Sequence, residues 1–160
     1  MTTPITQNIS LGYNFPMNML PDEHSKRFVA ILNKKTEIGR LLNALGHMTA
    51  GLAGGYGKED DMCFLQYADK DGGSHPHISH FPFIVLKADN ANQIRAVRNE
   101  CLSKGIPFTD FTSTMTVGTS AEQQQRTKET SEAELDYWGI CLFGSTNEIQ
   151  TFTKKFSLFR

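Results

Sequence analysis

Three side chains able to do chemistry are regularly spaced along one stretch of the sequence. Arg40, Asn43 and His47 stand at i, i+3 and i+7 within the segment TEIGRLLNALGHMTAGLAGG, residues 36–55. In a helix these positions share one side. An arginine can neutralise an anionic group, and a histidine can donate or accept a proton. The spacing therefore predicts a site for an anionic ligand or substrate.

Asp110 is the fourth candidate. It lies in the β-prone segment IPFTDFTSTMTV, residues 106–117. A carboxylate near the other groups can orient a histidine or an arginine. We expect Asp110 to converge with Arg40 and His47, and Asn43 to hydrogen-bond substrate or backbone.

Small residues surround the three polar groups, where a solvated helix face would carry Glu and Lys. They are Gly39, Ala44, Gly46, Ala50 and Gly51. Each glycine costs roughly 1 kcal/mol of helix propensity relative to alanine. One interpretation is that a ligand or another backbone comes close to this face. The other is helix-on-helix packing that needs small residues and leaves His47 merely hydrogen-bonded.

Two further motifs are weaker. The segment HPHISH places His75, His77 and His80 together, but its proline and loop setting favour a solvated turn over a metal site. The glycines of GGYG and DGG do not open a helix after a strand, as phosphate-binding loops do. We therefore predict neither a metal nor a cofactor.

The elements that must position these residues follow from periodicity. In residues 36–55 the apolar side chains recur at helical spacing and predict a core face, with Thr36 as the N-cap. That face comprises Ile38, Leu41, Leu42, Leu45, Met48 and Leu52. The apolar run RFVAILN, residues 27–33, predicts a buried strand directly before the helix.

Strands and helices then alternate, which is the pattern of a layered α/β domain with a mixed sheet. Further strands are expected within residues 62–68, 81–88, 106–117 and 135–144, and helices after Asp89 or Asn90 and after Ser145. Residues 69–80 read as a loop, and the polar residues 119–134 as an inserted short helix or flap. The chain divides into an N-terminal arm, 1–26, and a single domain, 27–160.

Composition limits the function classes. A formal charge of −1 over 160 residues gives no global attraction for polyanions, which argues against tight non-specific nucleic-acid binding. No apolar run reaches the roughly 20 residues of a membrane span, and MTTPITQNIS does not resemble a secretory signal. Cys63, Cys101 and Cys141 are odd in number and lie in apolar segments, which predicts buried free thiols and a cytoplasmic location.

Parts of the chain resemble the peptidyl-tRNA hydrolase II family. The residues FVAILN and IGRLLNALGHMTAGL resemble its first strand and helix, with Gly39 on the family glycine, Arg40 on the lysine and His47 on the histidine. The segment IPFTDFTST resembles its D-x-G-x-T motif, with Asp110 on the aspartate and Thr114 on the threonine. The closing residues YWGICLFGSTNEIQTFTKKFSLF resemble its final strand–helix–strand.

A nearer resemblance is to an uncharacterised family sharing this fold, in which HFPFIVLKA, DFTSTM and DYWGICLFG look like recurring signatures. Membership implies a three-layer α/β/α fold with a mixed sheet of about four or five strands, and a homodimer. The chain departs from the hydrolases because Arg40 cannot give up a proton as lysine can, Ala44 replaces a glutamine and Thr112 replaces a glycine.

Two functions follow as expectations. The first is a hydrolase acting on an anionic, tRNA-like or nucleotide-like substrate, with Arg40, His47 and Asp110 as catalytic residues and Gly39, Asn43 and Thr114 binding substrate. The second is a non-catalytic domain that uses the same scaffold to bind a small anionic ligand or another subunit.

Overall fold

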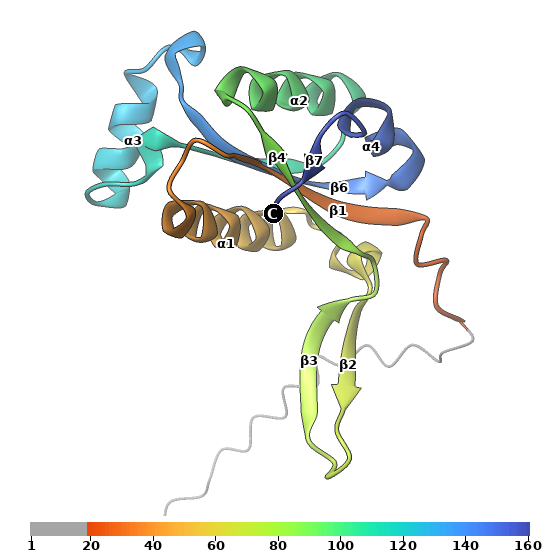
Figure 1. The fold of residues 1–160 in the computed structure, drawn as a ribbon. Coiled ribbons are helices and arrows are strands. Elements are labelled where there is room, and N and C mark those ends of the chain that lie inside the picture. Colours follow the sequence, from red (N-terminus) through yellow and green to blue (C-terminus); the bar gives the residue numbers. More distant parts are fainter. Residues whose placement is uncertain (1–18) are drawn as a thin grey trace, which may run out of the picture.

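A five-stranded mixed sheet forms the centre of the molecule (Figure 1). The computed structural model describes residues 19–160, so most of the predicted N-terminal arm lies outside them. The strand order is β5-β6-β1-β4-β7. Strands β1 and β4 pair in parallel, and the other pairs are antiparallel. The strands are β1 (Lys26–Asn33), β4 (Phe83–Ala88), β5 (Phe108–Thr112), β6 (Tyr137–Ser145) and β7 (Ser157–Leu158).

Helices cover both faces of this sheet (Figure 1). Helix α1 (Ile38–Gly55) packs on one face, and α2 (Ala91–Lys104) and α4 (Thr146–Thr153) pack on the other. Two separate apolar clusters fill the spaces between the layers. The expectation of a three-layer α/β/α domain with a mixed sheet is therefore confirmed. Helix α3 (Ser120–Lys128) stands beside α1 at one end of the sheet (Figure 1).

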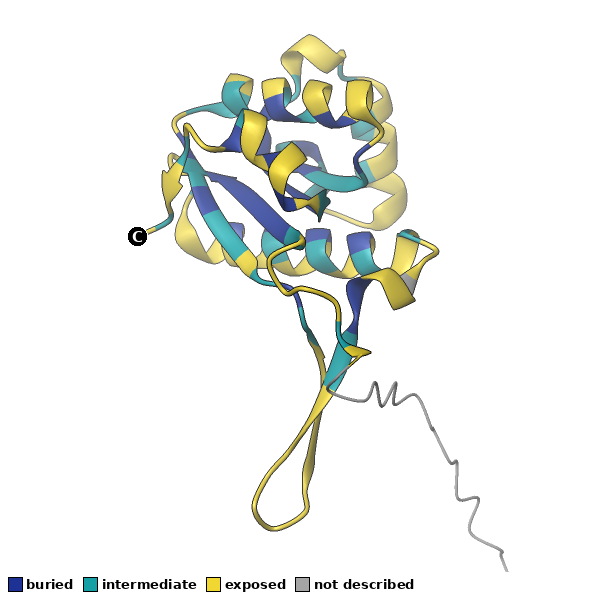
Figure 2. Cartoon of the chain, turned by 90° about the vertical axis from the view of Figure 1, so that its right-hand side faces the viewer, coloured by how far each residue is buried: buried dark blue, intermediate teal, exposed yellow. Residues whose placement is uncertain are grey.

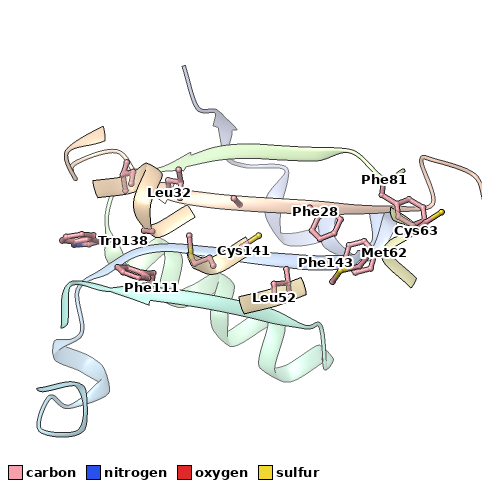
Figure 3. Packing of buried hydrophobic residues seen from close by; sticks show 14 residues of the cluster. Phe28, Leu32, Leu52, Met62, Cys63, Phe81, Phe111, Trp138, Cys141 and Phe143 are labelled. Atoms are coloured by element: carbon pink, nitrogen blue, oxygen red, sulfur yellow. The ribbon is translucent and has the colours of Figure 1, made fainter. Parts of the chain in front are cut away.

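Helix α1 is held to the sheet by a narrow apolar stripe. Leu41, Ala44, Met48 and Leu52 are buried in the first cluster, part of which Figure 3 shows. A β-carbon at position 139 of β6 would lie 2.7 Å from the Met48 Cε atom. The glycine of β6 at this position therefore lets α1 approach the sheet closely.

The predicted core face of α1 is partly wrong. Ile38 and Leu42 are 52% and 60% exposed, because they lie on the flank of the stripe away from the sheet. Ala44, which the spacing predicts on the polar side, is fully buried. The N-cap is also corrected from Thr36 to Glu37, whose carboxylate accepts hydrogen bonds from the backbone N–H groups of Gly39 and Arg40.

The segment expected to be a loop at residues 69–80 is instead half of a hairpin. Strands β2 (Phe64–Ala68) and β3 (Ser74–Ser79) form a separate two-stranded sheet that projects from the body (Figure 2). Asp69 stabilises the connecting turn, because its side chain accepts hydrogen bonds from the Asp71 and Gly73 N–H groups. The loop prediction failed because turn-forming residues occupy only the first part of this segment.

The cysteine prediction is confirmed in its structural part. Cys63, Cys101 and Cys141 are buried and free. Burial raises the pKa of both Cys101 and Cys141 to about 12. Among residues 19–160, no helix combines the length and the hydropathy needed to cross a membrane.

Candidate functional site

The polar flank of α1 faces a large hollow. This hollow has a volume of about 840 Å³ and lies between α1 and α3, with the end of β5 and the following turn η3 (Ser113–Met115) forming its remaining wall. From α1 it receives Asn43 and His47. The other lining residues are Phe111, Met115, Thr116, Ser120, Gln123, Gln124, Thr127 and Lys128. The predicted helix face therefore borders an open space rather than the protein's own core.

A second hollow continues the first toward the N-terminus of α1. Its volume is about 320 Å³, and it shares Asn43 and Thr116 with the larger one. Its other lining residues are Glu37, Gly39, Arg40, Val117 and Trp138. We call the two hollows together the α1–α3 groove.

Aromatic rings support the two basic side chains of α1. The Arg40 guanidinium lies 5.7 Å from the Trp138 ring centroid, and the His47 ring stacks on Phe111 at 5.8 Å. Both rings belong to the buried cluster beneath α1 and lie close together in it (Figure 3). A cation over an aromatic face gains about 0.5–1 kcal/mol at an exposed site. The sheet thus provides a rigid backing for groups that remain exposed to the groove.

The glycines of α1 have two different surroundings. A β-carbon at Gly46 would meet nothing within 4 Å, so this part of the helix borders open space. A β-carbon at Gly51 would lie 3.3 Å from Thr109 Cγ2, so this glycine allows β5 to pack closely. The small residue Gly51 thus serves packing against a strand rather than against the helix that one interpretation expected, and the close approach of a ligand to this face stays a prediction.

Helix α3 is attached to the rest of the site by polar contacts. The Arg126 guanidinium donates hydrogen bonds to the carbonyl oxygens of Thr114 and Val117 at 3.0 and 3.1 Å. The Thr127 hydroxyl donates to the Gln123 carbonyl, so it accepts from Thr114 at 2.8 Å. None of the helix's own side chains is buried. The insertion at 119–134 therefore forms a short helix, one of its two predicted forms.

Asp110 does not join Arg40 and His47. Its carboxylate accepts a hydrogen bond from Arg98 Nε of α2 at 2.8 Å, on the opposite face of the sheet from α1. Successive residues of a strand point to opposite faces, so Phe111 faces His47 while Asp110 faces α2. The predicted convergence of the three residues is wrong for this reason.

The remaining predicted residues take different places. Gly39 lines the smaller hollow, and its N–H binds Glu37. These bonds from the helix N-terminus hold the pKa of Glu37 below its ordinary value. Thr114 is 7% exposed and lines neither hollow, since its hydroxyl bonds Thr112 and Thr127. Its contact with a substrate stays a prediction.

The histidines of the hairpin lie away from the groove. His75 Nε2 is 3.1 Å from the Asp69 carboxylate, and His80 Nε2 is 2.8 Å from the Pro21 carbonyl oxygen. Within the described residues 19–160, no group of three or more His, Cys, Asp or Glu side chains is placed to hold a metal ion.

Sequence reasoning missed one wall of the groove. The polar composition of residues 119–134 indicates an insertion and gives no sign that its helix lines a site. The spacing of Thr119 and Glu122 could have located the start of this helix, because the two form a reciprocal capping box. Their sequence context identifies Phe111 and Trp138 only as strand residues. Their contacts with His47 and Arg40 depend on which strands pack against α1.

The arrangement can bind an anion, and it offers little assistance for proton transfer. Arg40 provides a permanent charge, and Asn43 provides an amide beside it. His47 could exchange a proton with a bound molecule. Within the described residues, no carboxylate forms a hydrogen bond or an ion pair with the His47 ring. The histidine–acid pair expected for general base catalysis is therefore not assembled.

Comparisons with known proteins place the chain in a family. The family model described as protein of unknown function (DUF2000) matches residues 26–160. A solved structure of the protein of unknown function Atu0240 from Agrobacterium tumefaciens strain C58 is similar, with a TM-score of 0.72 and 18% identity. The match covers 85% of this chain and 98% of that chain. At this identity, the likeness shows the fold alone. No curated protein matches the sequence. Since the family model covers most of the chain, this protein belongs to the DUF2000 family.

Proposed function

We propose that the protein binds a small anionic molecule in the α1–α3 groove. The observation that carries this proposal is the pair of exposed basic side chains, Arg40 and His47, each backed by a buried aromatic ring and facing the same groove. The larger hollow, of about 840 Å³, is within the range of roughly 300–1,000 Å³ usual for sites that take drug-sized ligands. A nucleotide-like molecule is therefore of suitable size.

Electrostatics support an anion over a cation. The larger hollow is lined by Lys128 and His47 and by no acidic residue. Glu37 lines the smaller hollow, but both of its carboxylate oxygens accept bonds from the α1 N-terminus. The helix dipole further compensates a carboxylate at this position. Arg40 interacts with Glu37 through charge but is not tied to it by an ion pair, so its guanidinium can also meet a ligand.

A hydrolase is the second candidate, favoured by the single observation that His47 and Asn43 line the same hollow. The resemblance to peptidyl-tRNA hydrolase II in residues 36–55 supports a tRNA-like or nucleotide-like substrate, while the Arg98 pairing of Asp110 argues against acid–base assistance from that residue. Release of product from a peptidyl-tRNA mimic, lost in His47→Ala, would favour this candidate over binding alone.

The test of binding uses pyrophosphate and AMP as probes. We expect either probe to stabilise the folded chain, by about 2.7 kcal/mol at a hundredfold excess over its Kd. Arg40→Ala should weaken binding by tenfold or more, since a charged hydrogen bond contributes about 1.5–3 kcal/mol. Both effects are measured by thermal unfolding and isothermal titration calorimetry.

Lys70→Ala is the matched control, because it removes the same charge from the exposed hairpin turn, which lines neither hollow. Equal loss of affinity in Lys70→Ala and Arg40→Ala would show non-specific attraction and contradict the proposal. We also retain as proposals a cytoplasmic location, which the buried free thiols support, and a homodimer.

A further inference from the structure

The α1–α3 groove contains two cationic positions rather than one. Arg40 lines the smaller hollow and Lys128 lines the larger. Each hollow also has its own aromatic wall, Trp138 in the first and Phe111 in the second. The two are continuous at Asn43. The groove is thus built as two adjacent subsites of similar chemistry.

Neither Arg40 nor Lys128 is held in an ion pair with a carboxylate among residues 19–160, although Arg40 and Glu37 interact through their charges. Arg95 and Arg98 on the other face of the sheet are, in contrast, paired. Lys128 is an exposed side chain in the last turn of α3, and Arg40 is exposed in the first turn of α1. Opposite helices therefore present the two charges.

We propose that the natural ligand is elongated and carries an acidic group near each end, one bound by Arg40 and the other by Lys128. This inference rests on the proposed anion-binding function and names the ligand class. The part of the ligand between the acidic groups would lie along Asn43 and against the apolar surface of Phe111 and Met115.

The length of α1 sets the scale of such a ligand. Arg40 and His47 are seven residues apart, which is about 10 Å along a helix. Lys128 lines the same hollow as His47 from the opposite helix, so we take this axial distance as the scale for the separation of the two acidic groups. A ligand that reaches both cations binds with higher affinity, because its second contact forms within a complex that already exists. With a matched spacer, this gain is on the order of a hundredfold or more over one contact.

The test is calorimetric titration of the full chain with straight-chain dicarboxylates from succinate to sebacate, with decanoate as the single-ended counterpart of sebacate. We expect affinity to rise with length and to be highest near sebacate, on the order of a hundredfold above decanoate. Arg40→Gln and Lys128→Gln should each reduce sebacate affinity to the level of decanoate. Lys70→Gln is the charge-matched control and should change neither affinity.

The outcomes separate the two proposals. If decanoate and the dicarboxylates bind equally well, or if Lys128→Gln leaves sebacate affinity unchanged, the two-ended ligand is ruled out while anion binding survives. If no carboxylate, pyrophosphate or AMP binds at all, the proposed function fails as well. Circular dichroism of each variant checks folding, and glutamine is chosen because it preserves helix propensity at these exposed positions.

Discussion

The two helices that form the groove are held in opposite ways. Helix α1 places Leu41, Met48 and Leu52 in the buried cluster against the sheet. Helix α3 buries none of its own side chains and is fixed through Arg126 and Thr127. Apolar burial contributes about 1.5–3 kcal/mol for a large side chain, whereas a hydrogen bond contributes a net 0.5–1.5 kcal/mol.

This difference assigns the helices different tasks. A helix fixed by core packing can hold Arg40 and His47 in one place, and a helix held by a few polar contacts can open at a lower free energy than the whole domain. A groove with one firmly packed wall and one weakly attached wall is suited to admit a ligand.

The largest effect is expected for Leu41→Ala in α1. Leu41 is completely buried, so its truncation should lower the free energy of unfolding by about 2–5 kcal/mol. Urea denaturation followed by circular dichroism measures the change. A loss below about 0.5 kcal/mol, the range of ordinary surface substitutions, would contradict the account of how α1 is held.

A smaller and local effect is expected for Arg126→Ala in α3. The change removes the guanidinium bonds to the carbonyl oxygens of Thr114 and Val117, which should cost about 1–3 kcal/mol of local stability. Amide hydrogen exchange should accelerate in residues 119–131.

The matching control is the thiol of Cys141, whose pKa burial raises to about 12. It should stay protected from alkylation at neutral pH in Arg126→Ala, because the reactive thiolate is not populated while the core is closed. Rapid labelling would show that α3 and the core open together.

Thr119→Ala should have a smaller effect still. It removes the side-chain half of the α3 capping box, which should cost about 1 kcal/mol of helix stability. Exchange at the first amides of α3 measures this loss. Thr119→Ser is the conservative comparison, since serine caps as well as threonine, and equal exchange in both variants would argue against the cap.

The smallest effect is expected for Leu42→Gln, next to Leu41 on the same helix. Leu42 is 60% exposed, and glutamine is a good helix former, so the free energy of unfolding should change by no more than about 0.5 kcal/mol. Comparing the free energies of unfolding of this variant and of Leu41→Ala, both from urea denaturation, shows which side of α1 packs against the core.

The local hydrophobic pattern predicted much of the fold, but it did not predict how wide the buried stripe of α1 is. Periodicity placed α1, β1 and β6, because each carries a strong and continuous apolar signal. It could not tell that the stripe of α1 is centred between Leu41 and Ala44, leaving Ile38 exposed. The packing of this stripe involves contacts between residues far apart in the sequence, such as Met48 of α1 against Gly139 of β6.

The candidate site shows the same limit. The side of α1 that faces the groove could be predicted from Arg40 and His47, since both follow from spacing within one helix. Asp110 could not be placed without knowing which face of β5 meets α1, and nothing in the sequence pairs it with Arg98, twelve residues earlier. The opposite wall was missed because α3 lacks an apolar stripe to reveal how it packs.

The most direct test of the central claim is an amide NMR titration of the full chain with pyrophosphate. The account predicts chemical-shift changes confined to the exposed flank of α1 near Arg40 and His47, to the turn after β5 and to α3. Changes centred on Arg98 and Asp110, or no saturable change anywhere, would contradict it.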